Sequence, residues 1–415
     1  VERVYALAGD LLLCGGSGEV SALRLSDEVP HAEQVWREEL PGDPASMVVA
    51  DGKLFVSTLN GNLLCYGADE VEAHRYSGVT QPPEVAEDAW TGRAAEIIER
   101  TGVHDGYCLC VGLEDGRLVE ELARQSELYV IGIDSDAAKM DRIRRRLDAA
   151  GLYGPRVALI VDDPASAPLP PYLATLIVSE QPAAIASGAA RTDRLFAPLR
   201  PYGGVVCLGI PAQEHARFEA AVGAAHLQGA YVERSGDWTL LRRPGALSGA
   251  GTWTHQYADP ANTVVSSDSI VRAPLGLLWF GGSSNVNILP RHGHGPPEQV
   301  VGGRLFIEGP DGIRAQDVYT GRVLWERELP GFGRAYDNTS HQPGANALGS
   351  NYSSAEDGIY VVWDGRCLRL DPATGETIGE FALPPAPGED QSQGWGYASV
   401  YRDLLIAGAS PMIFD

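Results

Sequence analysis

The chain is short of positive charge. Lys and Arg number 32 against 55 Asp and Glu, so the formal net charge is −23 at pH 7. Nucleic acids and anionic membrane surfaces select protein faces that are rich in Lys and Arg. We therefore expect an acidic, solvated exterior, and neither nucleic acid nor an anionic membrane surface as a partner.

Long apolar runs are also missing. No stretch reaches the roughly 18 apolar residues of a membrane-spanning helix, and Val1 opens directly onto a strand-like pattern. We expect no membrane span and no signal peptide in this chain. The missing initiator Met suggests a processed chain or a fragment.

Cysteine is scarce and widely spaced. The six cysteines include no adjacent pair and no CxxC pair, which argues against a zinc ribbon, a thioredoxin-like redox site and haem attachment. Cys108 and Cys110 fall in one apolar run and would point the same way on a strand. We expect all six thiols to be free and most of them to be buried.

Glycine and proline, in contrast, are plentiful, with 49 and 28 residues. Such numbers suggest many turns and hence much β structure. The length of 415 residues exceeds what one hydrophobic core usually organises. Two domains, or one domain inserted in another, are therefore expected.

Strand-like repeats occupy both ends of the sequence. Residues 302–331, GGRLFIEGPDGIRAQDVYTGRVLWERELPG, consist of three alternating runs separated by an Asp-Gly and a Thr-Gly turn. The same order recurs in three further segments, which are 356–384, 50–66 and a looser copy at 7–41. Trp36 of the looser copy occupies the position of Trp325. Repeats of this kind are typical of propeller blades.

The repeat motifs resemble a known family. DVYTGRVLWE and DPATGET look like the Asp-x-x-Thr-Gly-x-x-x-Trp signature of pyrroloquinoline-quinone (PQQ) propeller repeats, and WTHQYADPANTVVSSD at 253–268 is similar to the segment with which quinoprotein-type propellers often begin. The resemblance covers about residues 1–78 and 250–415. It implies a β-propeller of four-stranded blades, with a Gly in each turn and a Trp that docks between blades.

The two repeat segments, assigned to 1–80 and 250–415, hold enough sequence for roughly five or six blades at this spacing. Closure of the ring would need sequence that is absent here, or a partner chain. The second part is therefore expected to be incomplete.

The pattern changes between residues 85 and 245, where apolar strands alternate with helical periods. Strands are expected at 107–111, 128–133, 157–161, 174–178 and 205–208, and helices at 117–124, 137–150, 192–199 and 214–226. A hairpin of residues 230–234 and 238–242 ends the segment. Such alternation predicts an α/β Rossmann-like domain with a parallel, doubly wound sheet.

Three local motifs of this insertion resemble the class I S-adenosylmethionine (SAM) methyltransferase family. CVGLEDGRL at 110–118 looks like motif I, GIDSD at 132–136 like the acidic end of the second strand, and LRPYGG at 199–204 like the turn before the fifth strand. The resemblance implies the seven-stranded methyltransferase fold.

The resemblance also implies a cofactor site, which comprises Gly112, Glu114, Gly116, Asp134 and Asp163. The loop glycines let the backbone approach the cofactor, Asp134 would accept the ribose hydroxyls, and Asp163 would address the adenine. Glu114 stands where the family has its second glycine, and its side chain would crowd the adenosine. Cys110 replaces the usual acidic residue of the first strand.

The fourth strand of the insertion ends in Ser179, Glu180 and Gln181, without the Asn/Asp-Pro-Pro-Tyr run of many methyltransferases. We therefore expect a degenerate domain that has lost SAM, with a working SAM-dependent methyltransferase as the alternative. The basic run Arg142–Arg146 lies on a predicted helix flanked by acids. A solvated helix face is expected there, not an RNA-binding surface.

Two polar stretches precede repeats of the second segment, PRHGHGPP at 290–297 and YDNTSHQPGANALGSNY at 336–352. His292, His294 and His341 could bind a divalent metal if the loops converge. Further ligands or hydrogen bonds could come from Asp337, Asn338, Asn346 and Asn351, and Arg291 could bind a carboxylate or phosphate. The alternative is that these residues satisfy turns and strand ends.

The lack of a vicinal cysteine pair argues against bound PQQ, because a quinoprotein dehydrogenase needs such a platform, a carboxylate-rich calcium site and a catalytic Asp. Resemblance to PQQ-like propeller proteins of planctomycete-type bacteria implies a periplasmic or extracellular protein. We expect a binding or scaffold protein that assembles with itself or with a protein partner, with a small-molecule ligand as a further possibility. The alternatives are a SAM-dependent methyltransferase and a quinoprotein-like or metal-dependent oxidoreductase.

Overall fold

The chain forms two compact units, Val1–Gly78 and Val79–Asp415. The computed structural model describes residues 2–25, 32–69, 71–76, 87–186, 189–281, 287–289, 295–336, 345, 349–388 and 394–409, without the side chains of 189–191. Within these ranges, no helix is long and apolar enough to cross a membrane.

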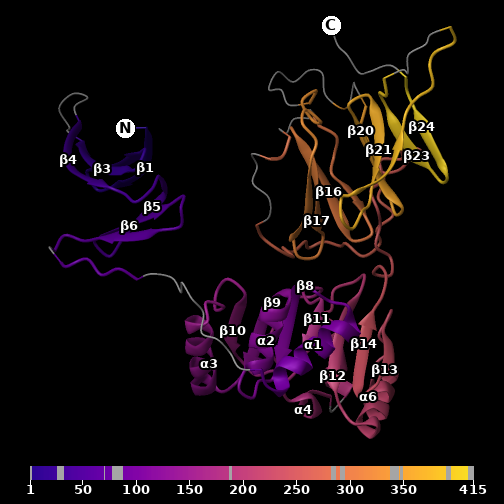
Figure 1. Ribbon diagram of the computed structural model, residues 1–415, viewed down its shortest axis with the longest axis horizontal. Coiled ribbons are helices and arrows are strands. Elements are labelled where there is room, and N and C mark those ends of the chain that lie inside the picture. Colours follow the sequence, from indigo (N-terminus) through magenta and orange to yellow (C-terminus); the bar gives the residue numbers. More distant parts are fainter. Residues whose placement is uncertain are drawn as a thin grey trace. The chain divides into compact units, whose positions relative to one another are not determined.

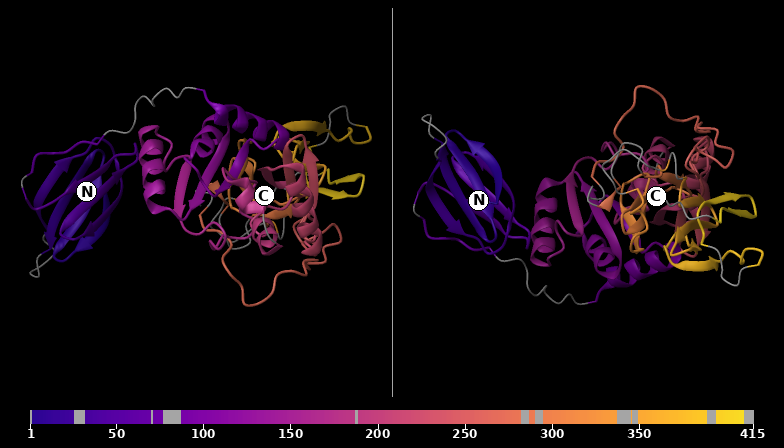
Figure 2. Two further views of the ribbon diagram at one scale, coloured as in Figure 1. Left: turned by 90° about the horizontal axis from the view of Figure 1, so that it is seen from below. Right: turned by 90° about the horizontal axis from the view of Figure 1, so that it is seen from above.

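The first unit consists of two antiparallel sheets (Figures 1 and 2). One sheet contains β1 (Arg3–Ala8), β2 (Leu11–Gly16), β3 (Glu19–Leu25) and β4 (Ala32–Glu39), and the other contains β5 (Pro44–Ala50), β6 (Lys53–Thr58) and β7 (Leu63–Tyr66). Alternating side chains of both sheets, among them Val20 and Val56, bury one shared core. Asp51 and Gly52 have φ of 48° and 69° in the β5–β6 turn, as a tight Asp-Gly hairpin requires.

A seven-stranded sheet lies at the centre of the Rossmann-like domain (Figure 1). Its strands are β8 (Asp105–Val111), β9 (Glu127–Asp134), β10 (Val157–Val161), β11 (Leu176–Val178), β12 (Gly204–Gly209), β13 (Tyr231–Ser235) and β14 (Trp238–Arg243). The spatial order is β10-β9-β8-β11-β12-β14-β13. The first five are parallel and doubly wound, and the last two form the expected antiparallel hairpin. The predicted methyltransferase-like Rossmann fold is confirmed.

Helices cover both faces of this sheet (Figures 1 and 2). The face with Cys108 and Cys110 packs against α1 (Ala89–Thr101), α2 (Arg117–Gln125) and α3 (Ala137–Ala149). The opposite face packs against α4 (Pro182–Ala186), α5 (Ala189–Phe196) and α6 (Ala212–Ala224). The prediction missed α1, although Asp88 caps it by accepting hydrogen bonds from the backbone N–H groups of Trp90 and Thr91.

The connection between β10 and β11 contains no helix. All of residues 162–175 are described, and they form turns and extended chain. In a doubly wound sheet such a crossover normally carries a helix that covers one face. Here a proline-rich loop takes that place.

The second repeat segment forms two four-stranded antiparallel sheets and a hairpin. The sheets are β15 (Gln299–Val301), β16 (Arg304–Gly309), β17 (Gly312–Asp317) and β18 (Val323–Glu328), followed by β19 (Tyr352–Ala355), β20 (Gly358–Trp363), β21 (Arg366–Leu370) and β22 (Thr377–Phe381). The hairpin pairs β23 (Ala398–Tyr401) with β24 (Leu404–Ala407). The four-stranded sheets agree with the expected repeats, whereas PQQ-type identity and ring closure stay predictions.

Equivalent positions recur in these sheets. Trp36 pairs with Ala22, and Trp325 pairs with Ala315, each next to a register shift in the third strand. The Trp325 indole donates a hydrogen bond to the carbonyl of Pro372 at 3.0 Å. A Cβ on Gly375 would lie 2.5 Å from the same ring. The Thr374-Gly375 turn is therefore a packing site for a tryptophan of the preceding sheet.

The sequence analysis missed a second tryptophan packing site of this kind. The Trp279 indole donates a hydrogen bond to the carbonyl of Val318 at 2.9 Å. Any side chain at Gly321 would overlap the Trp279 ring. Trp279 therefore contacts the turn after β17 as Trp325 contacts the turn after β21.

The same turn after β17 also packs on the Rossmann-like domain. The buried carboxylate of Asp317 pairs with the guanidinium of Arg200. Tyr319 meets Tyr172 edge-on, with ring centroids 5.6 Å apart. Within the second unit, an ion pair and an aromatic contact thus join repeat and Rossmann-like domain.

Candidate functional site

The predicted cofactor loop lies between β8 and α2, at the carboxyl edge of the parallel strands. Gly112 and Gly116 have φ of 79° and 74°, a left-handed conformation that favours glycine. A Cβ on Gly116 would also lie 2.6 Å from Ile143 of α3. The glycines thus set the backbone of the loop and the close approach of two helices.

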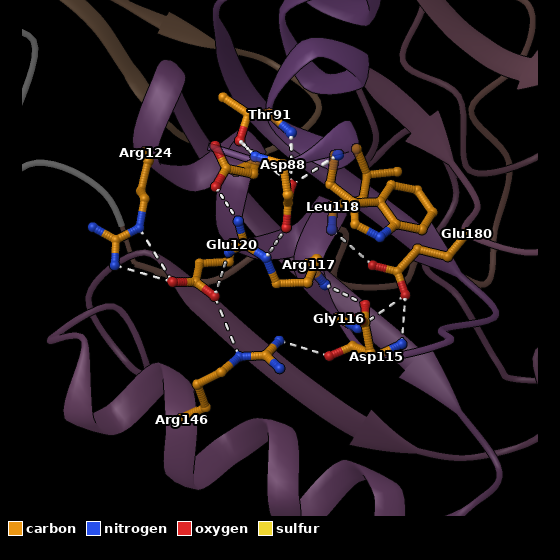
Figure 3. A network of polar contacts seen from close by, with 12 residues as sticks. Asp88, Thr91, Asp115, Gly116, Arg117, Leu118, Glu120, Arg124, Arg146 and Glu180 are labelled. Carbon is orange, nitrogen blue, oxygen red and sulfur yellow. Dashed lines mark hydrogen bonds and ion pairs between the residues drawn. The ribbon is translucent and has the colours of Figure 1, made fainter. Parts of the chain in front are cut away.

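Glu180, two residues after the end of β11, organises this loop (Figure 3). Its Oε2 accepts hydrogen bonds from the backbone N–H groups of Glu114, Asp115 and Gly116 at 2.6, 3.1 and 2.9 Å, and its Oε1 accepts one from Leu118 at 2.8 Å. Gly116 is the N-cap of α2 and Leu118 is in its first turn, where the helix dipole favours an anion, and Glu114 and Asp115 belong to the loop before it.

The Glu180 side chain is almost fully enclosed, with 4% of the residue exposed. Burial raises the pKa of its carboxyl, and the backbone hydrogen bonds oppose that rise. The four N–H contacts replace the water that an anion would otherwise need. Glu180 is therefore a fixed internal anion that shapes the loop.

The neighbours of Glu180 hold the same loop. Ser179 donates a hydrogen bond to the carbonyl of Gly112 at 3.4 Å, and the Gln181 amide donates one to the carbonyl of Leu113 at 3.1 Å. The backbone N–H of Glu180 also reaches the Gly112 carbonyl, at 3.2 Å. The three consecutive residues that directly follow the short strand β11 thus position the loop.

Asp134, at the end of β9, faces the loop from the other side. Its Oδ2 accepts hydrogen bonds from the Leu113 backbone N–H at 3.0 Å and the Lys139 ammonium at 2.7 Å, and its Oδ1 accepts one from Asp136 at 2.9 Å. Lys139 also donates to the carbonyl of Leu113 at 2.6 Å. Burial raises the pKa of Asp134, but these hydrogen bonds outweigh it and the net pKa is lowered.

The structure places the remaining candidates as follows. The Glu114 side chain is exposed, and its backbone N–H is bound by Glu180. Asp163 is exposed two residues beyond Val161, which pairs with Asp134, and it accepts hydrogen bonds from Ala165 and Ser166 within its own turn. The predicted residues therefore share one edge of the sheet, while their roles toward a cofactor stay predictions.

Cys110 is buried on β8, and burial raises the pKa of its thiol. A neutral group thus stands where the methyltransferase family has an acid. All six cysteines are free, and only Cys65 is exposed. The prediction of free and mostly buried thiols is confirmed.

A charge network covers the loop-facing end of α2 (Figure 3). Arg117 lies within 2.9 Å of carboxylate oxygens of Asp88 and Glu120. The buried Glu120 also pairs with Arg124 and with Arg146, at 3.0 and 3.2 Å. The interpretation of 142–146 as a simply solvated face is wrong at Arg146, because its guanidinium compensates a buried carboxylate and donates to the Asp115 carbonyl.

The metal hypothesis cannot be placed on the fold, because Arg291, His292, His294, Asp337, Asn338, His341 and Asn346 lie outside the described residues. Asn351 is described and is buried, and its amide donates to Glu308 and to the Phe332 carbonyl. Across the described ranges, no group of three or more His, Cys, Asp and Glu could hold a metal ion.

Sequence reasoning missed two residues of this site. Glu180 was noted only as a departure from a family motif, and Lys139 was not considered. The signal for Glu180 was its place at the carboxyl end of a strand that neighbours β8 in a doubly wound sheet. Lys139 lies five residues after Asp134 on α3, so the first helical turn brings its ammonium back to the strand end.

No family model matches the chain. No curated protein matches it either. A putative SAM-dependent methyltransferase structure from Methanococcus maripaludis is 17% identical, with a TM-score of 0.34 over 38% of this chain and 85% of its own. A SAM-dependent methyltransferase from Aquifex aeolicus is 15% identical, with a TM-score of 0.30 over 36% of this chain and 87% of its own. A TehB-like SAM-dependent methyltransferase from Corynebacterium glutamicum is 16% identical, with a TM-score of 0.29 over 38% and 89%.

Proposed function

We propose that the Rossmann-like domain binds SAM at the carboxyl edge of its sheet and acts as a SAM-dependent methyltransferase. The observation that carries this proposal is that hydrogen bonds hold loop 112–116 and the Asp134 carboxylate in fixed positions next to each other. Glu180 holds the loop through four backbone N–H groups, and Leu113 ties Asp134 to it. A preorganised backbone beside a charged carboxylate suits a nucleoside ligand.

The residues of this edge fit the cofactor in composition. Asp134 would accept the ribose hydroxyls, Asp163 would address the adenine amino group, and the backbone at Gly112 would approach the ligand. When bound, SAM would supply an electrophilic methyl group on its sulfonium. The exposed position of the Glu114 side chain leaves it free to turn into solvent.

Lys139 stands in the way of a ligand at Asp134. Its ammonium covers Asp134 and bridges it to the loop, so 5% of Asp134 is exposed. The lysine side chain has a flexible four-carbon stem, so its ammonium can turn outward and remain solvated. Ligand binding would therefore replace one ion pair by hydrogen bonds from ribose.

A second candidate function is a binding or scaffold protein with a degenerate domain. The Lys139–Asp134 pair favours it, because both carboxylate oxygens already have partners. The repeated sheets, with a tryptophan packed on the turn of a neighbouring sheet, support PQQ-like propeller blades that would present an assembly surface. Export to the periplasm would also support this candidate, because SAM is a cytoplasmic metabolite.

Calorimetric titration of the full chain with SAM and with S-adenosylhomocysteine separates the two candidates. We expect both ligands to bind, and Asp134→Asn to weaken binding by about tenfold, since a hydrogen bond to a charged group is worth roughly 1.5 kcal/mol or more. Asp148→Asn is the matched control, because Asp148 is an exposed acid of α3. Absence of binding to the wild-type chain would favour the scaffold.

A further inference from the structure

A cavity of about 230 Å³ lies under the loop that replaces the helix between β10 and β11. Val111 and Ile177 line it from the sheet, Leu169 from the loop, and Ile185 and Leu195 from α4 and α5. Its position follows from the missing crossover helix, because a loop with small and proline residues fills less space than a helix would. It lies on the face of the sheet opposite to α1, α2 and α3.

The lining of this cavity is apolar except at one point. Pro164, Ala165, Ala167, Pro168, Ala197 and Pro198 complete the apolar wall. Among the described lining residues, Arg194 of α5 is the one that carries a charge. Its side chain is exposed. A mostly apolar cavity with one polar anchor is the usual form of a small-molecule site.

The Arg194 guanidinium is also available. No hydrogen-bond or ion-pair partner for it lies in the described part of the chain, whereas Arg200 and Arg243 of the same domain are engaged by Asp317 and by backbone carbonyls. A free guanidinium pairs best with a carboxylate or another planar anion. The strongly acidic chain makes such a local cation the feature that would select an anion.

We propose that this cavity binds a small apolar acid, whose hydrocarbon part lies between the sheet and loop 164–169 and whose carboxylate pairs with Arg194. The volume is below the roughly 300 Å³ at which drug-sized pockets begin, so the ligand is of medium-chain or single-ring size. The inference goes beyond the proposed function and holds whether or not the domain transfers methyl groups.

Calorimetric titration of the full chain with octanoate and octanol, without SAM, tests the inference. We expect octanoate to bind more tightly than octanol. Arg194→Gln should weaken octanoate about five-fold, the range of an exposed ion pair, and leave octanol unchanged. Arg217→Gln, at an exposed arginine of α6, should change neither. Equal affinities for the two probes, or equal effects of the two arginine variants, would overturn the proposal.

Ala167→Phe fills the cavity from the loop side without altering a strand or helix. We expect it to abolish binding of both probes, with the far-UV circular dichroism unchanged. Undiminished binding in a folded Ala167→Phe variant would show that the probes bind elsewhere, and the proposal would fail. If this variant does not fold, the arginine pair alone decides. SAM is absent from these titrations, so they test the cavity independently of the proposed SAM site.

Discussion

The ammonium of Lys139 lies 2.7 Å from the carboxylate of Asp134 and 2.6 Å from the carbonyl of Leu113. One side chain thus joins the acid at the end of β9 to the glycine loop after β8. The pair covers the carboxylate that we propose as the acceptor of the ribose hydroxyls. In the proposed function, SAM binding requires that Lys139 move away from Asp134.

Replacement of Glu180 should loosen the loop. In Glu180→Gln the side chain keeps one acceptor oxygen and turns an NH₂ group toward backbone donors, so buried N–H groups lose their partners. We expect the amides of Gly116 and Leu118 to exchange with solvent at least about thirtyfold faster, which corresponds to roughly 2 kcal/mol of local opening. Amide hydrogen exchange measures this directly.

Glu114→Gln serves as the control for Glu180→Gln, because the Glu114 side chain is exposed. Its effect on exchange should be small, as for surface substitutions in general. Unchanged protection of the Gly116 amide in Glu180→Gln would contradict the organising role of Glu180.

Glu308 should make the repeat segment less stable as the pH rises. Burial raises the pKa of Glu308 well above its usual value, opposed by the hydrogen bond from Asn351. Within the described residues its Oε2 has no hydrogen-bond partner, and the buried Tyr336 and Tyr352 are titratable neighbours. A carboxyl with a raised folded-state pKa contributes stability that is fully present below its unfolded value, near 4.5, and lost as the pH rises through the folded value.

Glu308→Gln carries the same shape without the charge. We expect its urea midpoint to exceed that of the wild type more at pH 8 than at pH 5. Urea unfolding at both pH values measures the difference. If the difference between the two urea midpoints were smaller at pH 8 than at pH 5, the pKa of Glu308 would not be raised in the folded state.

Gly375→Ala should lower the free energy of unfolding by more than backbone strain alone explains. Gly375 and Gly365 have φ of 73° and 72°, so alanine costs about 1 kcal/mol at either position. Only at Gly375 would the new Cβ collide with Trp325, whereas at Gly365 its nearest neighbour is 4.0 Å away. We expect Gly375→Ala to be less stable by a further ~2 kcal/mol in urea unfolding. Equal losses would mean that Trp325 adjusts freely.

The Rossmann-like domain was predictable because its signals are local and periodic. Strand β9 and helix α3 alternate with their hydrophobic periods intact, and both appear within two residues of their predicted bounds. Helix α1 was missed, because it lies before the first strand, where the alternation of strands and helices has not yet begun. The turn glycines of the repeats were likewise recognisable from their Thr-Gly motifs.

The site was only partly predictable. Gly112, Gly116 and Asp134 follow from spacing along one crossover, so sequence motifs reach them. Glu180 meets the loop from 64 residues away, and only the strand order brings the two together. The partner of Asp134 is a lysine rotamer, which no periodicity specifies. Tertiary packing, not local pattern, thus decides whether the edge is open or closed.

The dissociation constant of SAM for Lys139→Met, compared with the wild type, tests the account most directly. Removal of the ammonium leaves Oδ2 of Asp134 with the Leu113 N–H as its one remaining partner in the described structure, so we predict about tenfold tighter binding by calorimetry. Arg142→Met, at an exposed arginine of the same helix, should leave the affinity unchanged. Equal or weaker affinity in Lys139→Met, or no binding of SAM to either protein, would contradict the account.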